Sequence, residues 1–188
     1  MPSFPSFPAS LPGDGVILRP AAERDIPEIL IAHQDDPELF AALRMRRPPS
    51  ASELGRRTET ADSERAVGAR LWLTILAPGS DECRGQFDVH EAELQHGRAD
   101  VQVWVAPGHR RRGLGSAALA LGGRWLIEQA GLERVQLLIA PGNAAMLATA
   151  ERAGFHREGL LRSHWRERHG RADAEVWSLI RRDLASGG

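Results

Sequence analysis

Lysine and tyrosine are absent from this chain of 188 residues, and cysteine occurs once. The lone Cys83 excludes an internal disulfide and a thiolate metal cluster, which favours the reducing cytoplasm. A formal net charge of −1 provides no broad positive field, so nucleic acid is not an expected partner. No segment approaches the ~20 apolar residues that cross a bilayer, so no membrane partner is expected. The histidines show no metal-ligand spacing, and we expect no metal.

The bulk composition is that of an ordinary folded domain. Apolar residues make up 42% of the chain and charged residues 26%, whereas disordered chains are poorer in apolar residues. The length fits one domain. Residues 1–13 are rich in Pro, Ser and Phe and lack both the basic start and the apolar run of a signal peptide. We therefore expect a flexible N-terminal arm over residues 1–13 and a single domain over residues 14–188.

Hydrophobic periodicity predicts strands and helices in a mixed order. The predicted strands are residues 16–19, 71–76, 84–90, 98–105, 135–140 and 174–180. The predicted helices are residues 22–32, 37–43, 50–65, 113–130 and 143–153. Short links favour antiparallel neighbours among the central strands, whereas the long helix before residue 130 fits a parallel crossover. The pattern predicts an α+β fold.

A basic, glycine-containing turn joins the strand at residues 98–105 to the long helix. The turn reads His109-Arg110-Arg111-Arg112-Gly113-Leu114-Gly115-Ser116. Backbone N–H groups at a helix N-terminus bind anions, and glycines let that backbone approach a diphosphate closely. The arginines add positive charge. The alternative is a surface turn with a glycine-assisted helix start, but the flanking strand and helix favour the anion site.

The spacing Arg110-x-x-Gly113-x-Gly115 resembles the Arg/Gln-x-x-Gly-x-Gly/Ala signature of the GNAT superfamily of acetyl-CoA-dependent N-acetyltransferases. Asn143, followed by Gly154-Phe155 and Glu158-Gly159, resembles a second pattern of that family. The similarity covers roughly residues 16–184. It is greatest to the branch that acetylates the N-termini of ribosomal and other proteins.

This resemblance implies a mixed α/β fold with a splayed, mostly antiparallel sheet of six to seven strands and helices on both faces. The strand at residues 98–105 would part from the strand at residues 135–140, and acetyl-CoA, the cosubstrate, would enter that cleft. Backbone groups would hold its pantetheine arm and diphosphate, and a homodimer is compatible with the family. The implied cofactor-binding residues are Val103, Trp104, Val105, Arg110, Arg111, Arg112, Gly113, Leu114, Gly115, Ser116 and Asn143. Asparagine also suits a helix N-cap.

Direct attack of an amine on the thioester needs an oxyanion donor and a route for protons. The resemblance implies a backbone N–H near Val105 as the oxyanion donor. The family's tyrosine general acid falls on Ala150, and no tyrosine exists to replace it. Asp100 shares a strand face with Trp104 and is the first catalytic candidate, acting through water; a solvated or arginine-paired carboxylate is the alternative.

Two further catalytic candidates, Ser163 and His164, fall in the connection before the last strand, where a surface role is the alternative. Without the family's general acid, an acceptor that is already partly neutral near pH 7 is favoured. This favours an α-amine of pKa ~8 over a lysine side chain of pKa ~10.4. The acceptor would be a peptide N-terminus or a small-molecule amine. A non-catalytic acyl-CoA sensor remains open, as does a nicotinamide-dependent oxidoreductase suggested by Gly-x-Gly-x-x-Ala from residue 113, although no ribose-binding acid follows the next strand.

Overall fold

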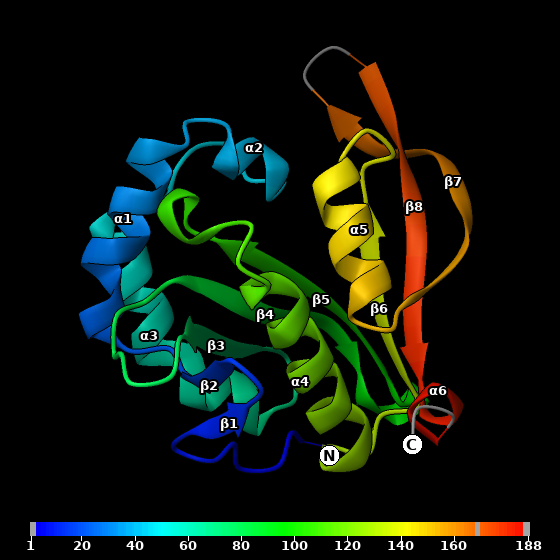
Figure 1. Cartoon of the computed structure of the whole chain (residues 1–188), viewed down its shortest axis with the longest axis horizontal. Coiled ribbons are helices and arrows are strands. Elements are labelled where there is room, and N and C mark those ends of the chain that lie inside the picture. Colours follow the sequence, from blue (N-terminus) through cyan, green and yellow to red (C-terminus); the bar gives the residue numbers. More distant parts are fainter. Residues whose placement is uncertain (1–2, 168–169, 186–188) are drawn as a thin grey trace.

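The computed structural model describes residues 3–167 and 170–185. Within these residues a single sheet of eight strands is flanked by helices on both faces (Figure 1). The strands are β1 (Leu11–Gly13), β2 (Val16–Pro20), β3 (Leu71–Leu76), β4 (Gly85–Glu93), β5 (Arg98–Val105), β6 (Arg134–Ile139), β7 (His156–Glu167) and β8 (Gly170–Ile180). The α-helices are α1 (Ile26–Asp35), α2 (Leu39–Ala42), α3 (Ala51–Ala66), α4 (Leu114–Glu128), α5 (Ala144–Arg152) and α6 (Arg181–Ala185).

The strands lie in the order β1-β2-β3-β4-β5-β6-β8-β7. The pair β5 and β6 is parallel and is joined through α4, while the other neighbours are antiparallel. The expected mixed, mostly antiparallel sheet is therefore confirmed, with one strand more than the upper limit predicted. Two strands were missed because β1 is only three residues long and β7 is exposed along most of its length, without apolar alternation.

The N-terminal segment is not a loose arm where the structure describes it. Phe4 is only 2% exposed within the main core. The ring of Phe7 lies 4.6 Å from that of Trp125 in α4, and β1 pairs with β2. The prediction of a flexible arm was wrong because its phenylalanines act as core residues that cover the end of α4, and burial of large aromatic side chains is strongly favourable.

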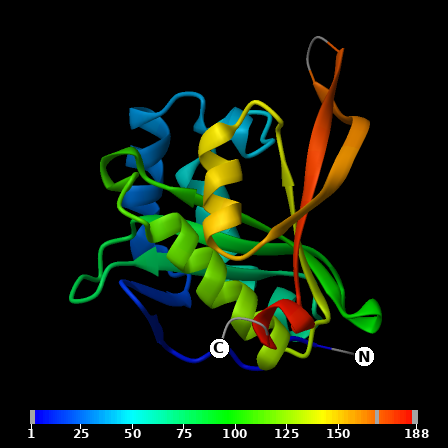
Figure 2. The same ribbon diagram turned by 45° about the vertical axis from the view of Figure 1, so that its right-hand side comes forward.

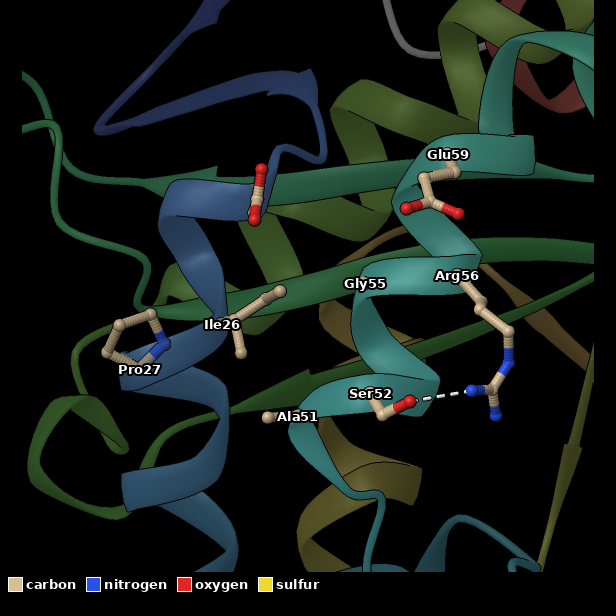
Figure 3. A pocket seen from close by; sticks show the side chains of 8 residues that line it. Ile26, Pro27, Ala51, Ser52, Gly55, Arg56 and Glu59 are labelled. Atoms are coloured by element: carbon tan, nitrogen blue, oxygen red, sulfur yellow. Dashed lines mark hydrogen bonds between the residues drawn. The ribbon is translucent and has the colours of Figure 1, made fainter.

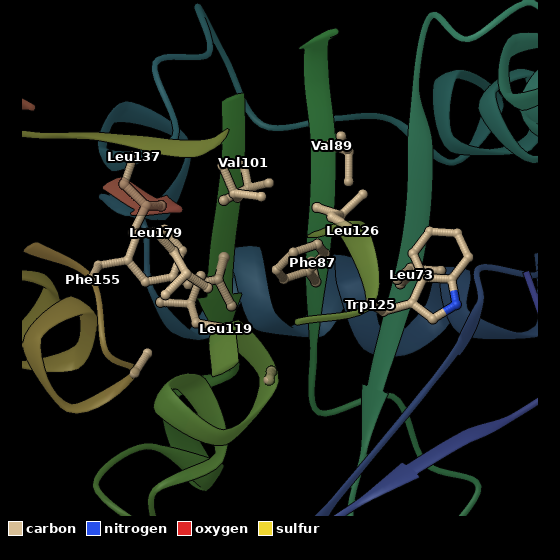
Figure 4. Packing of buried hydrophobic residues seen from close by; sticks show 14 of the residues in the cluster. Leu73, Phe87, Val89, Val101, Leu119, Trp125, Leu126, Leu137, Phe155 and Leu179 are labelled. Atoms are coloured by element: carbon tan, nitrogen blue, oxygen red, sulfur yellow. The ribbon is translucent and has the colours of Figure 1, made fainter. Parts of the chain in front are cut away.

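The main core lies between the sheet and the face covered by α4 and α5. Alternate residues of β4 and β5, such as Phe87 and Val101, point towards Leu119 and Leu126 of α4 (Figure 4). Gly122 lies where a Cβ would come within 2.6 Å of the Phe87 ring. The helix therefore packs closely against the centre of the sheet, as the periodicity of residues 113–130 predicts.

The opposite face of the sheet is covered by α1 and α3. Leu54 of α3 packs with Ile29 of α1, Cys83 and the partly buried Trp104 of β5. At the end of β2, the buried Arg19 makes two hydrogen bonds to Asp25, at 2.9 and 2.5 Å. These contacts fix α1 on the sheet, with its C-terminal end directed towards the end of β5. No helix in the described ranges is long and apolar enough to cross a membrane.

Candidate active site

The strands β5 and β6 are paired at one end and separate at the other (Figure 2). Their parallel pairing covers only Arg98–Asp100 on β5, opposite Arg134–Gln136 on β6. From residue 101 to residue 105, β5 has a paired neighbour in β4 but none on the β6 side within the described chain. The second half of β5 therefore presents an open strand edge inside the sheet.

The direction of the backbone groups along this edge follows from the hydrogen bonds to β4. The N–H of Ala106 donates to the carbonyl of Arg84 at 2.8 Å, on the β4 side. Because backbone groups alternate in direction along a strand, Trp104 also faces β4, whereas Val103 and Val105 face the opening. Gly85 allows this close approach of β4, since a Cβ there would overlap the Trp104 carbonyl oxygen. The open edge thus offers donors and acceptors at every second residue.

The turn after β5 folds back through two left-handed residues, Arg111 (φ 61°) and Gly113 (φ 81°), before α4 begins. Gly113 is needed for its backbone angle, because apart from its chain neighbours no atom of residues 3–167 or 170–185 lies within 4 Å of a Cβ placed there. A Cβ on Gly115 would lie in ordinary contact with its neighbours, 3.4 Å from Thr149 and 3.6 Å from Val105, which leaves little space for a side chain larger than a methyl group. The predicted anion-binding turn is therefore positioned at the N-terminus of α4, beside the open edge.

The arginine of the signature is directed away from this helix terminus. Arg110 Nη2 lies 2.6 Å from Asp36 Oδ2, just after α1, and its Nε donates to the carbonyl of Val105 at 2.9 Å. The hydrogen bond from Arg110 lowers the pKa of Asp36. Arg111 and Arg112 are exposed at the turn. All three arginines were expected to supply positive charge beside the diphosphate. Arg110 instead links the end of α1 to the end of β5, whereas Arg111 and Arg112 remain exposed at the turn.

Asp100 lies at the closed end of the opening. Gln136 of β6 donates to its two carboxylate oxygens at 3.2 and 3.4 Å, and burial raises the pKa of Asp100. At ~3.3 Å per residue, Asp100 is roughly 16 Å from Val105 along the strand. Its side chain shares a face with Gln102 and Trp104, as predicted. Asp100 therefore reaches the outer part of the open edge only through intervening groups or water.

Asp100 belongs to a chain of polar contacts that crosses the outer strands. Gln136 accepts from Arg134 at 2.8 Å, Arg134 binds Glu158 of β7 at 2.7 and 2.6 Å, and Ser178 donates to Glu158 at 2.6 Å. The hydrogen bond from Arg134 lowers the pKa of Glu158 to about 2. The glutamate of the Glu-Gly pattern thus ties β6, β7 and β8 together.

The segment from Asp36 to Arg44, which contains α2, crosses the mouth of the opening. It is held by Arg110 at one end, and the carbonyl of Leu43 accepts from Gln102 at 3.4 Å. At the other end Arg44 pairs with Glu167 of β7 at 2.5 Å and lies 3.9 Å over the Trp165 ring. The segment therefore connects the turn, β5 and β7.

Ser163 and His164 lie within strand β7, so their expected location in a connection was wrong. They occupy a break in the β7–β8 register, and Ser163 has a φ of 53°. Asp173 accepts from the Ser163 N–H at 2.7 Å, and Arg171 donates to the carbonyls of Ser163 and His164. A β-bulge of this kind replaces ladder bonds with side-chain bonds and was not visible as apolar alternation. Both side chains are exposed beside Trp165.

Asn143 caps helix α5, and its Oδ1 accepts from the N–H of Met146 at 3.0 Å. The N-cap alternative is therefore confirmed, and a contact to the cosubstrate stays a prediction. A separate surface groove between α1 and α3 contains Ile26, Ser52 and Glu59 (Figure 3). It lies at the opposite end of α1 from Asp36 and is not part of the opening between β5 and β6.

The profile of the acetyltransferase (GNAT) domain matches residues 16–156. The chain belongs to the GNAT acetyltransferase family. The mycothiol acetyltransferase of Clavibacter michiganensis is 36% identical over 126 residues, which cover 64% of this chain but only 40% of that protein. A Bacillus subtilis protein provisionally named ribosomal N-acetyltransferase YdaF is 25% identical over 169 residues, covering 89% of this chain and 90% of that protein.

The structure of Mycobacterium smegmatis RimJ in complex with CoA-disulfide has the same fold, with a TM-score of 0.74 and 22% identity. The similarity covers 90% of this chain and 83% of that one. The match to the family profile confirms the predicted family, whose cosubstrate is acetyl-CoA. The open edge and the turn at the start of α4 fit such a molecule, because an extended amide-containing arm pairs with a free strand edge and a diphosphate with a helix N-terminus.

Sequence reasoning missed three residues that shape this site. Asp36 and Arg44 acquire their partners through the path of α2, which no local pattern predicts. His33 is buried on α1 and could have been noticed, since it follows Ile29 by one helical turn on the apolar face.

Proposed function

We propose that this member of the GNAT family transfers the acetyl group of acetyl-CoA directly to a primary amine, with the weakly basic α-amino group of a peptide or small molecule as the preferred acceptor. The observation that supports this proposal is the open edge of β5 beside a glycine-containing helix start. The relatives that match the chain are named as acetyltransferases, and the acceptor is the part that needs experiment.

In this proposal the backbone does most of the binding. The groups of Val103 and Val105 that face the opening pair with the pantetheine arm, while the N–H groups from Arg111 to Ser116 hold the diphosphate. One N–H of the open edge stabilises the developing oxyanion. Trp104 lies between these two valines in the sequence, and its backbone groups face β4. Its side chain forms a wall of the acceptor site.

The amine nitrogen attacks the thioester carbonyl carbon, a C–N bond forms, and the C–S bond breaks. Asp100 retains a role as a distant proton relay, and Ser163 and His164 remain candidates on the acceptor side. Because a positioned general acid or base contributes ~10²–10⁴-fold, positioning of the two substrates alone sustains turnover. An α-amine of pKa ~8 suits such a site, since a useful fraction of it is neutral near pH 7.

The decisive experiment is incubation with acetyl-CoA and a panel of peptides and small amines, with the free thiol of coenzyme A as the readout. The protein contributes little background, because burial raises the pKa of Cys83 to about 12 and its side chain is enclosed. The absence of lysine also removes side-chain amines of the enzyme as acceptors. We expect thiol release with α-amine acceptors and slower release with lysine side chains.

The matched control is a Gly115→Val variant, which should weaken acetyl-CoA binding by about 10-fold or more and reduce thiol release in parallel. Tight binding of acetyl-CoA by the wild-type protein without thiol release across the panel would instead identify a non-catalytic acyl-CoA sensor. That result would reject the proposed transfer.

A further inference from the structure

His33 is a buried imidazole near the end of β5 that the proposed chemistry has not used. The residue is only 7% exposed, and its Nδ1 atom is buried without a hydrogen-bond partner in the described structure. Buried polar atoms in folded proteins are nearly always paired, so an unpaired one requires an explanation. Because Nδ1 is closed to solvent, the ring nitrogen that a substrate amine can reach is Nε2.

His33 lies in the last turn of α1, beside the end of β5. Its ring centroid lies 6.0 Å from that of Trp104, the residue between the two valines that face the opening. One turn later, Asp36 binds Arg110, whose Nε reaches the carbonyl of Val105. His33 therefore lies on the acceptor side of β5, close to the backbone proposed to hold the thioester. Asp100, by contrast, lies at the closed end.

We propose that His33 is the general base of the transfer and accepts the proton of the attacking amine. This inference rests on the proposed function and assigns one chemical role within it. As the amine nitrogen bonds to the carbonyl carbon, its proton passes to Nε2 of His33 and then to solvent. The sulfur leaves with the electron pair of the C–S bond and takes a proton from solvent, so the products are the N-acetylated amine and the coenzyme A thiol.

The surroundings of His33 keep the ring neutral and able to accept a proton. Burial lowers the pKa of His33, and the charge of Asp36, just after the end of α1, opposes this shift only in part. Asp36 is itself paired with Arg110 from the turn. The ring next to that of His33 is Trp104 from β5, which packs in turn in a cluster with Leu54 from α3 and the buried thiol of Cys83, all uncharged near neutral pH. A neutral, partly desolvated imidazole is the state that a general base requires.

The test compares His33→Gln with His90→Gln. His90 is a matched control because its Nδ1 is also buried without a partner among the described residues, but it lies on β4 opposite Asp100, at the closed end. For each protein, kcat/KM for an α-amine peptide is measured across the titration range of histidine, and acetyl-CoA affinity is measured by calorimetry. We expect His33→Gln to lower kcat/KM by at least ~100-fold with unchanged acetyl-CoA affinity, and His90→Gln to retain the wild-type rate.

The pH profile provides a second test that a structural role would not reproduce. The wild-type kcat/KM should rise with pH through a group that titrates below the ordinary histidine pKa of ~6.5, and His33→Gln should lose this limb. Added imidazole should restore part of the rate of His33→Ala. If the wild-type enzyme is active but its kcat/KM does not rise with pH in this range, His33 is not the general base. This outcome does not depend on whether the variants fold. An inactive wild-type protein that binds acetyl-CoA would reject the proposed function instead.

Discussion

The two walls of the cleft are built differently. On the N-terminal wall every residue of β3 is buried, because α4 covers one face of the sheet and α1 and α3 cover the other. On the C-terminal wall no described residue of β7 is fully buried, and polar contacts tie the outer strands together. The wall that carries the open edge of β5 is therefore the more rigid one, and we expect the β7–β8 wall to adjust to the acceptor.

The largest stability effect should come from the buried ion pair of the N-terminal wall. Asp25 is 1% exposed and accepts from Arg19, from Thr74 at 2.6 Å and from the N–H of Ala22 at 2.9 Å. Asp25→Ala leaves the buried charge of Arg19 with only the exposed carboxylate of Asp81, which lies 3.4 Å from its Nε. We expect a loss of about 3–5 kcal/mol in the free energy of unfolding, measured by chemical denaturation.

The matched change on the other wall is Glu158→Ala, which removes the partner of the partly exposed Arg134. Water can solvate that arginine, so the loss should be below ~1 kcal/mol. Equal losses for the two variants would contradict the difference between the walls.

A second effect concerns the tight helix contact of the rigid wall. In Gly122→Ala the new methyl group meets the Phe87 ring, with three ring atoms at 2.6–3.0 Å from the Cβ position. Phe87 is fully buried and has little room to move. We expect a loss of about 1–3 kcal/mol, measured as the shift in the denaturation midpoint.

Gly55 in α3 is the control for this substitution, because in the part of the chain that the structure describes nothing lies within 4 Å of a Cβ placed there. Gly55→Ala should stabilise the protein by about 0.5–1 kcal/mol through helix propensity. A destabilised Gly55→Ala variant, or a neutral Gly122→Ala variant, would show that the contact between α4 and the sheet is looser than described.

The same contrast between walls explains how much the sequence could predict. Strands β3 and β5 were predicted with correct bounds, because burial between two helical layers leaves a clear apolar run or alternation. The exposed β7 carries no such pattern, so its strand and its bulge at Ser163 were missed. Apolar periodicity in the sequence reflects burial of one face. A strand held mainly by backbone hydrogen bonds to its neighbour shows no such periodicity.

The candidate site was predictable only where local chemistry defines it. The turn at Gly113 and Gly115 follows from a motif whose backbone angles and spacing are local. The partner of Arg110 was not predictable, because Asp36 reaches it only through the packing of α1 against β5. The base proposed here, His33, depends on the same long-range packing.

At Gly115, near its N-terminus, helix α4 approaches both walls. A side chain at Gly115 would enter the space between Val105 of β5 and Thr149 of α5. Gly115→Val should therefore distort the turn and weaken acetyl-CoA binding by about 10-fold or more, a loss of ~1.4 kcal/mol in binding free energy. Isothermal titration calorimetry with acetyl-CoA measures it. Thr149→Ala/Gly115→Val should recover part of the affinity, and an unaffected single variant would place the cosubstrate elsewhere.

The smallest effect should be the pH dependence of the polar C-terminal wall. In the folded protein Arg134 lowers the pKa of Glu158 from 4.5 to about 2, so the ionised glutamate stabilises the fold above its unfolded pKa. That stabilisation should disappear as the pH falls from about 4.5 towards about 2. Because the Glu158 side chain is 42% exposed, solvent screening should hold the neutral-pH contribution below ~1 kcal/mol.

The measurement is the difference in unfolding free energy between the wild-type protein and Glu158→Gln, followed from neutral to acidic pH. The difference should shrink as the glutamate becomes protonated, since both proteins then carry a neutral group beside Arg134. A difference that grows in acid would mean that Glu158 is destabilising when ionised, contrary to its contacts with Arg134 and Ser178. The same comparison with Asp25→Asn should show a larger loss of unfolding free energy, because solvent screens the deeply buried pair of Arg19 and Asp25 less.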